Sequence, residues 1–80
     1  MELEIITPEK KIYEGDVKLV KVPGTKGSFE ILHNHAPLIS TLEKGTIKVI
    51  SEDNKDDFFE VTGGIIEVQR NKIIILADLH

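Results

Sequence analysis

Residues 61–78 read VTGGIIEVQRNKIIILAD, and this run carries the strongest local signals of the chain. Ile66 and Val68 alternate with Glu67, which is the two-residue period of a strand with one buried face. Ile73–Ala77 is apolar without a break, which predicts a strand covered on both faces. The run therefore predicts two strands, and in so small a protein another chain would supply the second cover.

The same alternation continues through the rest of the chain. The further side chains expected to face the core are Leu3, Ile5, Phe29, Ile31, Ile47, Val49, Phe59 and Val61. Ile and Val, which favour pleated surfaces, number 18, whereas Leu, Ala and Met together number 10. Turn-forming residues interrupt the apolar segments at intervals typical of a sandwich or barrel. The sequence therefore predicts an all-β fold.

Besides the apolar run Ile73–Ala77, one segment departs from plain alternation. Between Val17 and Val22 the apolar parity changes between Leu19 and Val20, which predicts either a β-bulge or burial on both faces. The pair Gly63-Gly64 predicts a backbone with positive φ or the close approach of another chain, and the structural explanation is favoured.

Residues 52–59 combine an acidic run with two adjacent aromatic side chains. Residues 52–57 contain four acids and are expected to form an exposed hairpin loop. Phe58 and Phe59 cannot both face one core, because neighbouring side chains in a strand point to opposite faces. One of them is therefore expected to be an exposed edge aromatic or an anchor for a partner.

Length and composition limit the function classes. Eighty residues make a single domain, 1–80, which buries only about 60% of the surface that its unfolded chain exposes. The chain has no cysteine, which excludes disulfides and thiol catalysis and fits a reducing compartment. A net charge of −4 with scattered lysines argues against nucleic-acid binding. We expect a soluble protein without a signal peptide or a membrane-inserted segment, since no apolar run is long enough.

The stretch His33-Asn34-His35 is the one candidate for metal chemistry. On a continuous strand, His33 and His35 would share a face and could hold zinc together with a carboxylate. Gly27, five residues and then His-x-His also match the start of a cupin motif, but the glutamate that should follow is missing. Pro37 favours a turn here, so an exposed loop is the preferred interpretation. A small metal-binding sandwich using both histidines is kept as the alternative.

No set of residues has the spacing of a catalytic site. The serines lie inside strand patterns without a glycine-framed nucleophile turn, and Asp56-Asp57 belong to a charged loop that water would solvate. A non-enzymatic role is therefore expected. A free-standing module for peptide or carbohydrate remains a second alternative, although one tyrosine and three phenylalanines are few for an aromatic binding platform.

Several segments together resemble the epsilon subunit family of F-type ATP synthases. They cover the chain in order and are ITPEKKIYEGDVKLVKVPG, His35-Ala36-Pro37-Leu38, EKGTIKVI and VTGGIIEVQRNKIIILAD. The resemblance implies a flattened antiparallel β-sandwich of about ten short strands. It also implies a rotor part without cofactor or chemistry, which binds the gamma subunit in the central stalk and couples proton transport to ATP synthesis. Such a subunit lies peripherally at the cytoplasmic face of the bacterial inner membrane, with the rest of the catalytic sector as further partners.

The resemblance also suggests which residues meet these partners. The loop expected to face the polar loops of the proton-driven c-ring comprises Ser28, Glu30, Ile31, His35, Ala36, Pro37 and Leu38. Many relatives have an acid at the position of Ser28 and Pro-Gly at His33-Asn34, so Glu30 is the expected substitute for that acid. Apolar residues off the inward parity are the gamma-contact candidates, namely Leu19, Ile50, Phe58, Ile65 and Ile74.

One part of the family pattern is not carried over to this chain. Relatives commonly continue after the LAD segment into a helical hairpin that inhibits hydrolysis and in some bacteria binds ATP. The sequence given ends at His80, so neither inhibition nor nucleotide binding is expected of it.

Overall fold

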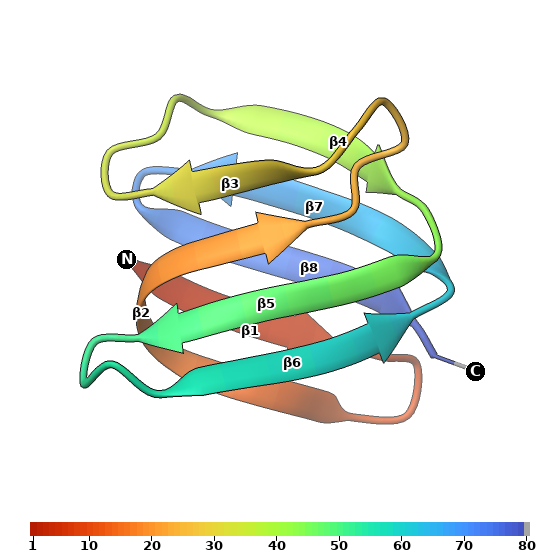
Figure 1. The fold of residues 1–80 in the computed structure, drawn as a ribbon, viewed down its shortest axis with the longest axis horizontal. Coiled ribbons are helices and arrows are strands. Elements are labelled where there is room, and N and C mark those ends of the chain that lie inside the picture. The colour runs from red at the N-terminus through yellow and green to blue at the C-terminus, as the bar shows by residue number, and fades with distance from the viewer. Residues whose placement is uncertain (80) are drawn as a thin grey trace.

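A computed structural model describes residues 1–79 as eight β-strands joined by short loops. The strands are β1 (Glu2–Ile6), β2 (Lys11–Val22), β3 (Phe29–Leu32), β4 (Leu38–Leu42), β5 (Gly45–Ser51), β6 (Asp56–Val61), β7 (Gly63–Gln69) and β8 (Lys72–Asp78). They form two layers, as Figure 1 shows, and the Cα trace measures 28 × 23 × 18 Å. The expected all-β sandwich is confirmed.

Each layer is a twisted sheet with its own strand order. The first sheet runs β4-β7-β8-β1 and ends with the first half of β2. The second sheet runs β3, the second half of β2, β5 and β6. In Figure 1 the second sheet is the layer nearer the viewer, and the first sheet lies behind it.

Strand β2 belongs to both sheets, and residues 1–79 form eight strands where about ten were expected. Lys11–Asp16 pairs with β1, and the chain then turns the corner so that Val17–Lys21 pairs with β5. The register with β5 shifts between Val17 and Leu19. Of the two explanations predicted for this segment, the register shift favours the β-bulge, because a strand that passes from one sheet to the other must bend there.

One strand pair is parallel, which corrects the expectation of a wholly antiparallel sandwich. Strands β1 and β8 run side by side in the same direction, with Leu3 opposite Ile73 and Ile5 opposite Ile75. A parallel pair needs a long connection, and here that connection is the whole intervening chain. The pair brings both ends of the sequence into the middle of the first sheet.

The core lies between the sheets and consists of aliphatic side chains. The fully buried large side chains are Leu3, Ile5, Ile31, Ile47, Ile66, Ile73, Ile75, Val17, Val20, Val22 and Val49. The five alternating strands predicted from the sequence are therefore confirmed. Phe29 and Phe59 are half-buried and pack against this core, whereas Phe58 is 61% exposed.

Strand β8 has only one face covered by the chain itself. Ile73, Ile75 and Ala77 are buried, but Ile74 is half-buried and Leu76 is 52% exposed. Within residues 1–79 this chain covers only one face of Ile73–Ala77, so the second cover by another chain stays a prediction. A two-layer sandwich of this length has no third layer to place over the outer face of its central strand.

The paired glycines have the predicted backbone role. Gly64 has φ 154°, and a Cβ atom at this position would lie 2.5 Å from the carbonyl oxygen of Leu76. The close approach comes from β8 of the same chain, so the structural interpretation of the pair is correct. Gly63 is different, since its nearest neighbour would be the carbonyl oxygen of Leu42 at an ordinary 3.5 Å.

Candidate functional site

The outer face of the first sheet carries an apolar groove of about 190 Å³. Its lining residues are Ile39, Ile65, Glu67, Ile74 and Leu76. The strand register explains this composition, because it sets Ile39 beside Glu67 and Glu67 beside Ile74 in one row. The next row sets Ile65 beside Leu76. Ile39 is 73% exposed and Ile65 is 45% exposed, so these side chains form a surface that water contacts.

The apolar groove continues into two further hollows. One, of about 330 Å³, shares Ile39 and Glu67 with it and extends to Pro37. The other, of about 460 Å³, shares Ile65 and Leu76 with it and extends to Pro8. Together they form a strip across the sheet, bordered by the loop before β4 and by the turn between β1 and β2. A contiguous apolar surface of this kind is typical of an interaction site.

A ladder of ion pairs borders the strip on β1, β2 and β8. The Lys11 Nζ atom lies 3.0 Å from Glu4 Oε1 and 3.5 Å from Glu14 Oε1. The Lys72 Nζ atom lies 3.3 Å from Glu4 Oε2 and 3.9 Å from Glu2 Oε1. The hydrogen bond from Lys11, followed by the one from Lys72, holds the pKa of Glu4 below its ordinary value. Glu4 is thus the best compensated acid on this face.

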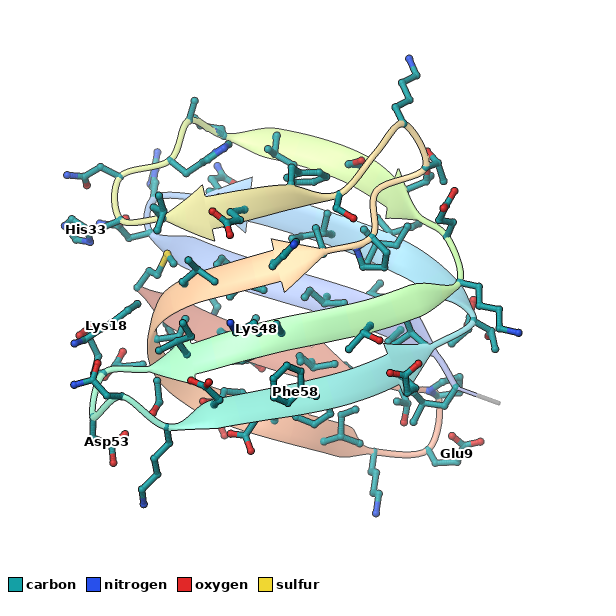
Figure 2. All side chains as sticks on the ribbon, in the orientation of Figure 1. Glu9, Lys18, His33, Lys48, Asp53 and Phe58 are labelled. Carbon is teal, nitrogen blue, oxygen red and sulfur yellow. The ribbon has the colours of Figure 1, made fainter. Side chains whose placement is uncertain are left out.

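The outer face of the second sheet has a different character. Leu19 lies beside Ile50 and Leu32, while Lys48 lies beside Phe58 in the adjacent row. Figure 2 shows Lys48 and Phe58 on this nearer layer. Leu19 and Ile50 are half-buried, whereas Leu32 and Phe58 are more than half exposed.

The five gamma-contact candidates therefore do not form one surface. Ile65 and Ile74 lie in the apolar groove of the first sheet. The other three, Leu19, Ile50 and Phe58, belong to strands of the second sheet. Parity along a strand indicates which residues point away from the core, but it does not indicate which of the two outer faces they reach. Ile39 and Leu76 were not among the candidates, although exposed apolar parity on β4 and β8 is the signal that would have found them.

The residues expected in one ring-facing loop are also divided. Ser28 lies in the loop before β3, Glu30 lies on the exposed side of β3, and His35 lies in the loop after β3. One loop precedes β3 and the other follows it, so they lie at opposite ends of the sandwich. Ile31 is fully buried, so its assignment as a direct contact is corrected: the side chain supports β3 from the core.

A reciprocal pair of amide hydrogen bonds holds the loop after β3. The Asn34 backbone N–H donates to Asn71 Oδ1 at 2.9 Å, and the Asn71 side-chain amide donates to Asn34 Oδ1 at 3.2 Å. Both asparagines have positive φ, which this residue type tolerates better than most. The pair ties the β3–β4 loop to the β7–β8 turn. Sequence reasoning missed it, because the two residues are 37 positions apart.

The histidines of this loop do not belong to a larger ligand set. Among residues 1–79, no group of three or more His, Asp or Glu side chains is placed to hold a metal ion. His35 is half-buried, and its Nδ1 atom lies 2.7 Å from the carbonyl oxygen of Ala36. His33 lies at the tip of the loop in Figure 2. In the same described range, no helix is long and apolar enough to cross a membrane.

Comparison with known proteins yields a consistent group of relatives. An epsilon chain of ATP synthase from Chlorobaculum tepidum is 38% identical over 76 residues, which cover 95% of this chain and 86% of the relative. The epsilon chain from Chlorobium limicola is 39% identical over 77 residues, covering 96% of this chain and 88% of the relative. The epsilon chain from Campylobacter hominis is 48% identical, and the match covers 95% of this chain but 59% of that longer relative.

Solved structures show the same fold. A chain of the Euglena gracilis mitochondrial ATP synthase, determined with OSCP, F1 and c-ring, has a TM-score of 0.88 at 21% identity. The match covers 94% of this chain and 48% of that one. A chain of the central stalk and c-ring of the Tetrahymena thermophila enzyme has a TM-score of 0.80 at 22% identity, covering 98% and 63%. Residues 1–79 match the model of the ATP synthase delta/epsilon chain β-sandwich domain, and the chain belongs to this family.

Proposed function

We propose that this chain is a non-catalytic rotor subunit of an F-type ATP synthase, which binds the gamma subunit through the outer face of its first sheet. The uncovered apolar groove is the observation that carries the proposal. Ile39, Ile65 and Leu76 are each at least 45% exposed on that face. In a subunit of a permanent complex, a partner would remove this apolar surface from water.

The first sheet is favoured over the second because its exposed apolar side chains line one groove. Its three hollows share lining residues and so form one strip. On the second sheet, the exposed apolar side chains Leu32 and Phe58 lie on β3 and β6, which are separated by β2 and β5. We therefore keep Ile65 and Ile74 as gamma contacts and add Ile39 and Leu76. Leu19, Ile50 and Phe58 would remain free in this arrangement or contact the rest of the catalytic sector.

The c-ring contact is proposed for the loop before β3. Ser28 lies in this loop, and Glu30 is exposed two residues further on. Pro37 borders the apolar strip, so the loop after β3, with His35 and Ala36, is proposed to meet gamma instead. Leu38 begins β4 and packs against the core, so it would support this loop. The subunit would thus connect gamma to the ring at the cytoplasmic face of a bacterial inner membrane, and it would couple proton transport to ATP synthesis through these contacts alone.

Site-specific crosslinking tests the choice of face. The chain has no cysteine, so Ile65→Cys and Phe58→Cys each introduce a single attachment point for a photoreactive maleimide. With the gamma subunit of the same organism, we expect a stable one-to-one complex on size-exclusion chromatography and crosslinking from position 65 only. Crosslinking from position 58 alone would assign gamma to the second sheet. Absence of any complex at micromolar concentrations would contradict the rotor function.

Charge reversal tests the ring contact. Glu30→Lys is expected to weaken coupling, measured as ATP-driven proton pumping in membrane vesicles, while ATP hydrolysis continues. Glu60→Lys is the matched control, because Glu60 is an exposed acid of the same sheet on strand β6. Unchanged pumping in the Glu30 variant would remove Glu30 from the proposed contact.

A further inference from the structure

Glu67 is the one charged residue among the five that line the apolar groove. On one side the register sets it beside Ile39, and on the other beside Ile74. Its side chain is exposed and points away from the core, since Ile66 and Val68 on either side are buried. A carboxylate therefore stands in the middle of the surface to which gamma is proposed to bind.

Two glutamates of β1 on this face differ from Glu67 in having ion-pair partners. Glu4 is paired with both Lys11 and Lys72, and Glu2 is paired with Lys72. Within residues 1–79, no lysine, arginine or histidine forms an ion pair with Glu67. Lys72, which lines a neighbouring hollow with Glu67, is already committed to the two glutamates of β1. Glu67 is exposed, so water reaches its carboxylate, and Arg70 and Lys72 line a neighbouring hollow with it.

A partner that covers the groove would remove this water. Burying an ionised carboxylate without a counterion costs several kcal/mol, which would cancel much of the stabilisation gained from the surrounding apolar surface. A basic side chain on the partner avoids that cost and turns the carboxylate into a contact that selects the partner.

We propose that the segment of gamma docked in this groove carries a lysine or arginine that pairs with Glu67, between apolar side chains that contact Ile39, Ile65 and Leu76. The inference rests on the proposed function. Arginine fits the site best, because its planar guanidinium can bind a carboxylate with two hydrogen bonds while its methylenes cover aliphatic neighbours. Glu67 is thus a specificity-determining residue in an otherwise apolar interface.

Binding measurements with three variants test the pairing. Glu67→Gln keeps the shape and removes the charge, and Glu67→Lys reverses it. Glu60→Gln is the control, an exposed glutamate near the end of β6 on the second sheet, where its carboxylate accepts a hydrogen bond from Thr46 that glutamine can also accept. Affinity for purified gamma is measured by isothermal titration at several salt concentrations. Circular dichroism and thermal unfolding verify that each variant folds, which is expected because residue 67 is exposed.

We expect Glu67→Gln to weaken binding by about tenfold or more and Glu67→Lys by roughly a hundredfold or more. The salt dependence of the dissociation constant should decrease in the glutamine variant, and Glu60→Gln should bind like the wild type. Equal or tighter binding by Glu67→Gln would overturn the pairing. If Ile65→Ala weakens binding in that case, the docking face stands and the pairing alone fails. If wild-type protein does not bind gamma, the proposed function fails as well.

Discussion

Gly64 shows how a single position can be set by its backbone surroundings. Gly64 on β7 pairs with Ala77 on β8, and its φ is 154°. The Leu76 carbonyl oxygen occupies the space where a Cβ atom would lie. Any Cβ atom there would have to displace the backbone of the central strand. The requirement is therefore for glycine itself and not for a small residue in general.

Gly64→Ala is expected to reduce the free energy of unfolding by about 2–4 kcal/mol, because strain at positive φ adds to a backbone clash. The matched control is Gly63→Ala, whose added methyl group meets only ordinary contacts and should change stability by less than about 1 kcal/mol. Urea unfolding of both variants measures this difference from the midpoints at constant m-value. Equal losses in the two variants would contradict the explanation.

Among the strands, β1 owes part of its attachment to charge. Glu4 lies on β1 and joins Lys11 on β2 to Lys72 on β8, so one carboxylate connects three neighbouring strands. Its pKa in the folded chain is lowered, chiefly by the hydrogen bond from Lys11. A group whose folded pKa is lowered stabilises the fold above its unfolded pKa, and this stabilisation is lost as the pH falls through the folded pKa.

The way in which the free energy of unfolding falls at acidic pH should therefore depend on Glu4. As the pH falls below the ordinary pKa of a glutamate, we expect the free energy of unfolding of the wild type to fall more steeply than that of Glu4→Gln. High salt should reduce the difference, because exposed ion pairs are screened. Glu9→Gln, in the β1–β2 turn outside the ladder, is the control. Parallel profiles of wild type and Glu4→Gln would show that the ladder contributes nothing measurable.

The whole molecule is a small two-layer sandwich with one outer face left apolar. A domain of this size buries a smaller fraction of its surface than a large one and is correspondingly marginal in stability. Leu76 on the central strand β8 remains 52% exposed, so the isolated chain does not gain the stabilisation that a third layer would add. Continuous association would supply that layer and would stabilise the folded state by mass action.

Adding gamma should therefore raise the unfolding temperature of this chain. At a gamma concentration about 100-fold above the dissociation constant, the expected stabilisation is about 2.7 kcal/mol, which corresponds to roughly 10 °C or more for a domain of this size. A fluorophore on a cysteine introduced at Glu52, in the β5–β6 loop, reports the unfolding of this chain alone. In the Ile65→Lys variant, gamma should raise the unfolding temperature much less than in the wild type. An unchanged midpoint despite a complex would show that gamma does not prefer the folded chain.

The local sequence pattern predicted the strands, the side chains that face the core, and a backbone requirement at the glycine pair. Ile66 and Val68 were assigned to the core correctly because side chains along a strand alternate with a period of two, whatever the strand's neighbours are. The bulge near Leu19 was visible for the same reason, as a break in that period. Family membership also followed from motifs that span the whole chain.

The candidate contacts needed the assembled fold. Pairing of β1 with β8, the course of β2 through both sheets and the bond between Asn34 and Asn71 join residues that are far apart in the sequence. These pairings arise when the two sheets close over a common core, a step that depends on all strands at once. The alternation of side chains therefore predicts that Ile65 and Phe58 point outward. It does not predict that they lie on opposite faces of the sandwich, because this depends on which strands become neighbours when the core closes.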